Sequence, residues 1–285
     1  MTVLADPTVV VENAEAQRGR RDYTLAVLVV LIGLIVCAAV LAPWIAPHPP
    51  NQTDILGTGA GPSASHLLGT DALGRDIFSR LLYGARLSLL GPALIIAFAT
   101  LAGVFLAISS VWIGGWYDVL VSRLLDLLFA IPGLLVAILA VAVIGPGLLA
   151  PVIALSLAYT PYIARVLRSV ALRERQLAYI ESSTLIGYSA WTICTRQLLP
   201  NVTSLIRAQA TIAFGAALVD LAATSYLGLG VQPPTAEWGI MVANGQSSLL
   251  NGQPWESVSA GVMIVVVVVL VNLIGERLAS RAENA

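Results

Sequence analysis

Residues 87–113 read LSLLGPALIIAFATLAGVFLAISSVWI, a run of apolar and small side chains without a single charge. An α-helix rises about 1.5 Å per residue, so roughly 20 residues cross the hydrocarbon core of a bilayer. Inside lipid a segment must satisfy its backbone hydrogen bonds internally, and a helix does so. The run therefore predicts a transmembrane helix.

Five further apolar stretches are long enough to span a membrane. Together the six occupy residues 23–45, 87–113, 124–144, 148–166, 203–229 and 258–278. The chain is 58% hydrophobic and 11% charged, whereas soluble proteins carry about 25% charged residues. We therefore predict an all-α integral membrane protein with six transmembrane helices. The first stretch exceeds the roughly 7–15 apolar residues of a signal peptide, which favours an uncleaved anchor.

The residue counts exclude several classes of activity. All 15 basic residues are arginines, so the chain has neither the lysine of an ATP-binding P-loop nor one for a Schiff base. Its histidines and cysteines are too few for a zinc cage made of those side chains alone; they are His48, His66, Cys37 and Cys194. The net charge of −1 gives no general attraction for nucleic acid. We expect no catalytic residue and no metal site.

Arginine placement predicts the orientation, because positive charge is retained on the cytoplasmic side. With the amino terminus inside, twelve arginines lie inside, and only Arg75, Arg80 and Arg86 lie outside. Both termini are therefore expected in the cytoplasm. The predicted segments are a cytoplasmic tail 1–22, the first helix 23–45, an extracytoplasmic or juxtamembrane segment 46–86, a five-helix core 87–278 and a cytoplasmic tail 279–285. Within the core, loop 167–202 is cytoplasmic and loop 230–257 is external.

The cytoplasmic loop 167–202 has helical periodicity. Its apolar positions predict an amphipathic helix that ends at Gly187; they are Leu177, Ile180, Thr184 and Tyr188. A second helical stretch is expected to stop at Pro200, with Asn201 capping the helix that follows. Two interpretations stay open at this point: a lever held between two membrane helices, or an arginine-rich helix lying on lipid headgroups.

The order of residues in this loop favours the lever. Glu181-Ser182-Ser183, then Gly187, then Leu199-Pro200-Asn201 resembles the EAA loop of ABC importer permeases. In that family a short coupling helix docks into a cleft on the ATP-hydrolysing subunit. The family usually has two alanines after the glutamate, where this chain has two serines.

Three other segments resemble the permeases of dipeptide, oligopeptide and nickel importers, and the C-type dipeptide subunit most of all. They are 66–89, 126–138 and 226–239. The residues that carry the resemblance in the first and last are Gly69, Thr70, Asp71, Gly74, Arg75, Asp76, Ser79, Arg80, Gly84, Arg86, Gly228, Gly230, Pro233, Trp238 and Gly239.

The resemblance implies the type I ABC importer permease fold, with 87–278 as the permease core and a cytoplasmic coupling helix. It implies a multi-pass subunit of the bacterial inner membrane that imports dipeptides or short oligopeptides. The expected partners are a second permease, two ATP-binding subunits and an extracytoplasmic solute-binding protein. ATP and Mg²⁺ would be used by those partners, with no cofactor bound here. Nickel or haem as the solute, a stand-alone channel and a membrane enzyme are the alternatives.

Several single residues support narrower hypotheses. The charges at Asp71, Arg75, Asp76 and Arg80 are spaced so that a juxtamembrane helix could neutralise itself, the alternative being a solvated charge cluster. Asp220 lies within the fifth span, where an acid is a functional candidate. It could line the substrate pathway, or it could form hydrogen bonds with Thr211, Ser225 or the partner permease.

Other positions predict local features of the spans. Pro92 and Pro132 can kink the second and third spans. Trp238 and Trp255 are typical of interfacial anchors. Asp126 is expected to pair with its neighbour Arg123 near the cytoplasmic end.

Overall fold

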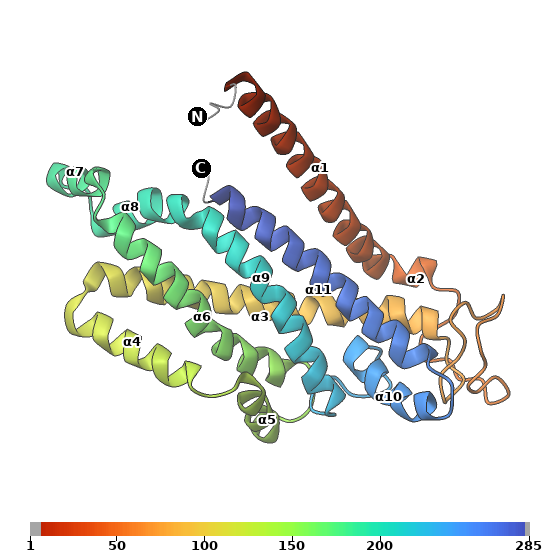
Figure 1. Cartoon of the computed structure of the whole chain (residues 1–285). Coiled ribbons are helices and arrows are strands. Elements are labelled where there is room, and N and C mark those ends of the chain that lie inside the picture. Colours follow the sequence, from red (N-terminus) through yellow and green to blue (C-terminus); the bar gives the residue numbers. More distant parts are fainter. Residues whose placement is uncertain (1–6, 283–285) are drawn as a thin grey trace, which may run out of the picture.

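The computed structural model describes the backbone of residues 7–282 and the side chains of residues 23–281 (Figure 1). In this part of the chain the regular elements are helices, with one isolated β-bridge between Thr70 and Asp76. The helices are α1 (Pro7–Val40), α2 (Ala42–Ile45), α3 (Ile77–Ile113), α4 (Gly115–Phe129), α5 (Gly133–Ile144), α6 (Leu149–Arg175), α7 (Ala178–Ile186), α8 (Ala190–Ile193), the π-helical turn η1 (Cys194–Leu198), α9 (Leu199–Tyr226), α10 (Trp238–Leu250) and α11 (Trp255–Ala282).

The predicted spans correspond to helices of the structure. Five helical stretches are long and apolar enough to cross a membrane, namely those of α1, α3, α6, α8–α9 and α11. Helices α4 and α5 together make a sixth, bent by 84° at a short break. Pro132 lies in that break and directly precedes α5, whereas α3 continues through Pro92. The all-α class and the membrane character are confirmed, and only the third span is broken.

Small residues let the central helices approach closely, as is common where lipid gives no hydrophobic drive. Helix α3 packs along α6, where Gly103 faces Ile163 and Ala164. Helix α9 packs along α11 in the same way, with Gly275 facing Ile212. These two contacts form the centre of the molecule.

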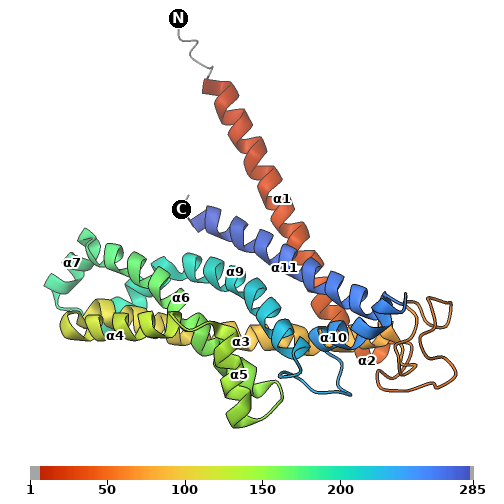
Figure 2. The same cartoon turned by 60° about the horizontal axis from the view of Figure 1, so that its bottom comes forward.

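Helix α1 lies outside this centre and diverges from it toward the amino terminus (Figure 2). Only 6% of its apolar stretch 23–40 is buried. Its carboxyl-terminal end is fixed by Arg86 on α3, which donates from Nε to the carbonyl of Ala39 and from a terminal nitrogen to the carbonyl of Val40, both at 2.8 Å. A cation at a helix carboxyl terminus satisfies carbonyls that have no partner inside the helix.

The two ends of the bundle differ in character (Figure 1). We call the end that carries α7 the α7 end, and the opposite end, with segment 46–76 and α10, the loop end. Segment 46–76 follows α2 as turns and irregular chain and enters α3 at Ile77. The juxtamembrane helix that the sequence predicts therefore begins only after Asp76, which caps it.

The structure adds detail to two of the predicted segments. Loop 230–257 contains helix α10, which the sequence did not reveal because its 13 residues are too short for a span. The predicted tail 1–22 is helical from Pro7 onward and continuous with α1. Residues 1–6 and 283–285, which belong to the predicted tails, lie outside the described residues.

The predicted helix stop at Pro200 is also wrong. The chain stays helical from α8 through η1 into α9, and Pro200 occupies the first turn of α9. A proline ring clashes with the carbonyl four residues earlier, which here is Arg196. The wider π turn at that place accommodates the clash. Asn201 is consequently inside α9 and is free to contact a neighbouring helix.

Candidate functional site

The helix predicted in the cytoplasmic loop is present as α7, which stands at the tip of the α7 end (Figure 1). It ends at Gly187, whose φ of +92° and ψ of +19° are left-handed. The N–H of Tyr188 donates to the carbonyl of Ser183 across this turn, at 3.1 Å. Only glycine adopts that backbone conformation without strain, so Gly187 sets the direction in which the chain leaves α7.

The surface of α7 and the turn after it is apolar and uncovered. Leu185 is 84% exposed and Ile186 75%, with Tyr188 and Trp191 also exposed. Of the four residues of the predicted apolar face only Ile180 is buried, so most of that face is exposed and does not pack on the bundle. Exposed apolar patches of this kind mark binding surfaces for other molecules. We call Leu185, Ile186, Tyr188 and Trp191 the docking patch.

The polar residues of the predicted coupling loop are divided between surface and interior. Glu181 and Ser182 are exposed, whereas Ser183 is buried and donates to the carbonyl of Tyr179 at 2.8 Å. Leu199 is half-buried and Pro200 is exposed at the start of α9.

Tyr179 connects α7 with the two long helices on either side of it. Its hydroxyl donates to Oε2 of Glu174 on α6 at 2.6 Å and accepts from Nδ2 of Asn201 on α9 at 2.8 Å. Burial raises the pKa of Tyr179, and the bond to Glu174 adds to the rise. Sequence reasoning missed this residue because a tyrosine in a loop carries no signal of its partners. Its hydroxyl therefore joins α7 to both α6 and α9.

The charged residues of segment 66–80 form a buried network at the loop end. Nε of Arg75 lies 2.6 Å from Oδ2 of Asp71, and Nε of Arg80 lies 3.7 Å from the same oxygen. A terminal nitrogen of Arg80 donates to the carbonyls of Pro50 and Pro234, at 3.1 and 3.3 Å, and to Oδ1 of Asn51 at 3.2 Å. Arg80 is 0% exposed. The solvated charge cluster considered from the sequence is therefore wrong.

Backbone turns position this network. Oδ1 of Asp71 accepts the N–H groups of Leu73 and Arg75, at 2.8 and 2.9 Å. Gly74 sits in the turn at φ +74°, and a Cβ there would lie 1.8 Å from the carbonyl oxygen of Asp54. No other residue fits this close approach. Thr70 and Gly69 are buried beside it, and Ser79 accepts from the N–H of His48 at 3.1 Å.

The structure brings the two family segments of the loop end together. Ser88 Oγ on α3 accepts from the N–H of Trp238 at 2.9 Å and donates to Oε1 of Glu237 at 3.0 Å. The indole of Trp238 donates to the carbonyl of Leu81 at 3.0 Å. Trp238 is 0% exposed, so its predicted role as an interfacial anchor is wrong, while Trp255 is partly exposed. Gly84 packs against Glu237 and Trp238.

Glu237 is a second residue that sequence reasoning missed. It caps α10, accepting the N–H groups of Gly239 and Ile240 at 2.9 and 3.1 Å. Burial raises the pKa of Glu237, and these hydrogen bonds, together with that from Ser88, oppose the rise. Glu237 directly precedes α10, but glutamate is not among the usual N-cap residues, so the sequence gave little signal for this role. Among the other predicted residues of this segment, Gly230 is buried, and Gly228 and Pro233 are exposed.

Asp220 lies half-buried on α9 and accepts a hydrogen bond from the hydroxyl of Tyr159 on α6, at 2.8 Å. The sequence suggested Thr211 or Ser225 as the partner of Asp220, and Tyr159 was not among the partners considered. Asp126 likewise pairs with Arg165 on α6 at 2.6 Å and not with the neighbouring Arg123. In both cases the partner comes from another helix, which spacing along the chain cannot show.

Comparison with known proteins finds the same segments in one family. Residues 67–284 match the family described as binding-protein-dependent transport system inner membrane component, and residues 20–62 match the N-terminal TM domain of oligopeptide transport permease C. The "Probable D,D-dipeptide transport system permease protein DdpC" of Escherichia coli is 35% identical, over 89% of this chain and 84% of its own. The glutathione transport system permease protein GsiD of Escherichia coli is 37% identical, over 92% of this chain and 86% of its own.

A solved structure supports the fold independently. The membrane subunit in an inward-facing structure of the MetNI methionine ABC transporter matches with a TM-score of 0.58 and 20% identity. The match covers 71% of this chain and 96% of that chain. At this identity the likeness concerns the fold alone.

Proposed function

Because this chain belongs to the family of binding-protein-dependent transport system inner membrane components, we propose that it forms, with a second permease, the pathway of an ATP-driven importer of short peptides. The chain is a multi-pass permease subunit of an ABC importer of the inner membrane. Membership in this family implies partner ATPase subunits and a second permease. What we propose beyond this is the role of individual residues and the nature of the solute.

The observation that carries the proposal is the exposed docking patch on α7. Leu185 and Ile186 are exposed apolar side chains at a helix tip, and apolar patches of this kind mark interaction surfaces. We assign this cover to the ATP-hydrolysing subunit, with Glu181, Ser182 and Gly187 at the contact. ATP and Mg²⁺ are used by that subunit, and this chain binds no cofactor directly.

The connections of α7 supply a mechanism for alternating access. Closure of two ATPase subunits moves α7, and Tyr179 passes the movement to Glu174 on α6 and Asn201 on α9. Both helices then shift as rigid elements, which is the usual form of such transitions. The 84° break between α4 and α5 gives the third span a place to bend.

The orientation follows from the same assignment. If α7 meets an ATPase, the α7 end faces the cytoplasm, in agreement with the arginine excess predicted there. The loop end then faces outward, where a solute-binding protein delivers its cargo. Segment 46–76 and α10 are the surfaces available to it.

The solute class rests on the relatives, whose names refer to D,D-dipeptide and glutathione transport. Asp220 is the candidate pathway residue for a peptide amino group. We expect Asp220→Asn to reduce uptake of dipeptides with a free amino group more than uptake of N-acetylated ones, since asparagine can still accept from Tyr159. An equal fractional loss of uptake for both kinds of dipeptide relative to the wild type, or no loss for either, would remove Asp220 from the pathway.

The test of the proposed function is reconstitution of the complete transporter in liposomes. Dipeptides, longer peptides, nickel and haem are offered separately, each with and without ATP and the binding protein. Accumulation of dipeptides that requires both is the expected result. Accumulation of nickel or haem alone would keep the permease assignment and overturn the solute class.

A further inference from the structure

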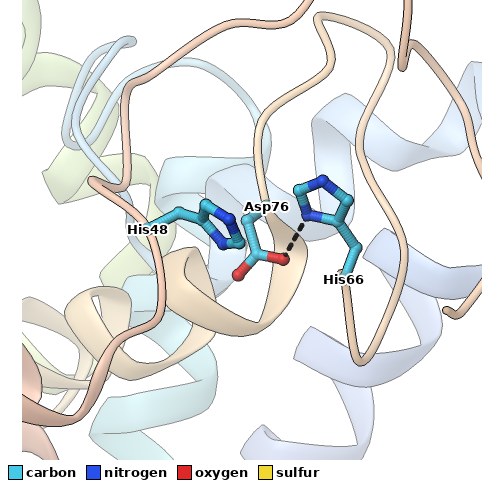
Figure 3. A group of neighbouring side chains, drawn as sticks. All are labelled: His48, His66 and Asp76. Atoms are coloured by element: carbon cyan, nitrogen blue, oxygen red, sulfur yellow. Dashed lines mark hydrogen bonds and ion pairs between the residues drawn. The ribbon is translucent and has the colours of Figure 1, made fainter. Parts of the chain in front are cut away.

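The only two histidines of the chain meet at the loop end, although 18 positions separate them in the sequence. His48 follows α2, His66 lies in segment 46–76, and Asp76 caps α3 (Figure 3). A ring nitrogen of each histidine and a carboxylate oxygen of Asp76 all lie within 4.8 Å of one another. Potential metal ligands from three separate parts of the chain thus lie close together.

The distances fit a small divalent cation. Nδ1 of His66 is 2.9 Å from Oδ1 of Asp76, a hydrogen-bond distance about 0.5 Å shorter than the roughly 3.4 Å between neighbouring ligands on a tetrahedral zinc ion with bonds of about 2.1 Å. The imidazole of His48 stacks on that of His66 with ring centroids 4.8 Å apart and planes inclined by 28°. The ligand atoms of all three side chains thus already lie near one another.

One buried atom of this group lacks a partner. Nδ1 of His48 is inaccessible to solvent and has no hydrogen bond in the described part of the chain. A buried polar atom without a partner is costly, and a ligand that binds it removes the cost. The hydrogen bond between His66 and Asp76 alone would explain two of the three residues as a support for the start of α3, but it does not explain His48.

The group opens into a cavity of about 180 Å³ that has room for an ion and its water ligands. His48, Gln52, Asp54, His66, Gly74 and Asp76 line this cavity. Two of the six are carboxylates and none is an arginine, so the lining attracts positive charge. Asp76 is nearly inaccessible, with its side chain 1% exposed, which strengthens its field.

We propose that His48, His66 and Asp76 bind one divalent transition-metal ion of the zinc type. Imidazole and carboxylate are the ligand classes that suit zinc, and three protein ligands leave a position for water. The ion takes the place of the proton between His66 and Asp76 and ties segment 46–76 to the start of α3. This site revises the expectation from the residue counts, because a carboxylate completes what two histidines cannot. The site is independent of the transported solute.

The test uses the full chain in detergent, purified with an affinity tag that contains no histidine and stripped with EDTA. Titration with Co²⁺ is expected to give one equivalent per chain with the visible absorption of a four- or five-coordinate ion, and Zn²⁺ should displace it. His48→Gln and His66→Asn should each weaken Zn²⁺ binding by about tenfold or more. Asparagine keeps a donor for Asp76, so His66→Asn preserves the local hydrogen bond.

Two controls separate this site from others. The double variant Cys37→Ser, Cys194→Ser should bind Zn²⁺ like the wild type. Zn²⁺ should raise the unfolding temperature of the wild type but not of the histidine variants, all compared against EDTA. Unchanged binding in both histidine variants would overturn the proposal.

A further measurement does not depend on any variant. Zinc X-ray absorption of the wild type reports imidazole ligands directly, and the chain has only these two histidines. Scattering from two imidazoles is expected. No zinc bound, or bound zinc without imidazole scattering, would reject the site even if a variant failed to fold.

Discussion

Arg80 shows how the motif charges at the loop end are used. Its guanidinium reaches Asp71 on one side and the carbonyls of Pro50 and Pro234 on the other, so one side chain joins segment 46–76, α3 and the chain before α10. Removing such charges from water is costly, and the network is stable only because the opposite charges and carbonyls are adjacent. The sequence predicted that these opposite charges pair with one another, but it placed the pairs on the surface of a juxtamembrane helix.

Arg75→Gln should destabilise the loop end strongly. The change leaves the buried carboxylate of Asp71 without its 2.6 Å partner, and breaking a buried pair costs about 3–5 kcal/mol. We expect a lower unfolding temperature in detergent and reduced assembly with the partner subunits. Thermal unfolding followed by tryptophan fluorescence measures the first effect.

The matched control for this prediction is Arg165→Gln. Arg165 also forms a 2.6 Å ion pair, with Asp126, but those side chains are 40% and 56% exposed. Exposed pairs contribute about 0–1 kcal/mol, so this variant should unfold like the wild type. Equal destabilisation by both changes would show that burial of the loop-end network is not what stabilises it.

Trp238 and Asp220 show which features of a residue the sequence cannot predict. An aromatic ring near the end of an apolar run is usually interfacial, and only the packing of α10 on α3 reveals that Trp238 is buried. The sequence identified Asp220 as exceptional, but its partner Tyr159 is 61 positions away on another helix. Residue types and spacing thus identified which residues matter, while their contacts required the fold.

At the scale of elements, α7 is defined by the turn that ends it. Gly187→Ala forces a side chain into a left-handed backbone, at about 1–2 kcal/mol, although the added Cβ would meet no atom within 4 Å. The strain changes the direction in which the chain leaves α7. We expect ATP-dependent uptake by the complex to fall several-fold while the unfolding temperature changes little.

Gly252→Ala provides the control for this variant. Gly252 also has a positive φ, +80°, with open space around it, but it follows α10 at the loop end. It imposes the same kind of backbone strain away from the docking patch. Uptake should stay near the wild-type level, and an equal loss in both variants would show that general strain, not the position of α7, limits transport.

Tyr179→Phe removes the hydroxyl that joins α7 to α6 and α9. Packing of the ring is retained, so stability should change by less than about 1 kcal/mol. Peptide taken up per ATP hydrolysed should decrease by about two- to tenfold, because less of the movement reaches the long helices. Proteoliposome uptake measured beside ATP hydrolysis gives this ratio.

Tyr226→Phe is the comparison for that experiment. Its hydroxyl also donates a hydrogen bond, to Gln246 at 3.0 Å, between α9 and α10. This contact lies at the loop end and is not part of the connection to α7. The connection would be refuted by a Tyr179→Phe transporter with the wild-type ratio of uptake to hydrolysis.

The helices themselves were largely predictable from the sequence. Hydropathy locates spans because lipid requires long apolar helices, and the predicted stretches coincide with α3, α6, α9 and α11. Hydropathy does not detect α10, which is short, or tell a proline that breaks a span, Pro132, from one that does not, Pro92. Those outcomes depend on whether neighbouring helices hold the two halves in line.

The two ends of the molecule differ in polarity and packing. At the loop end a buried polar network joins segment 46–76, α3 and α10, and at the α7 end an apolar helix tip is left uncovered. Long packed helices connect the two ends. This arrangement suits a subunit that receives its driving force from another protein.

The most direct measurement of this account is ATP-dependent uptake of a labelled dipeptide by the reconstituted complex when the docking patch carries Leu185→Glu and Ile186→Glu. Both side chains are exposed, so the chain should fold and insert normally. The account predicts that ATPase binding and uptake fall by about tenfold or more. Wild-type uptake by this variant, or accumulation by the purified chain alone, would contradict it.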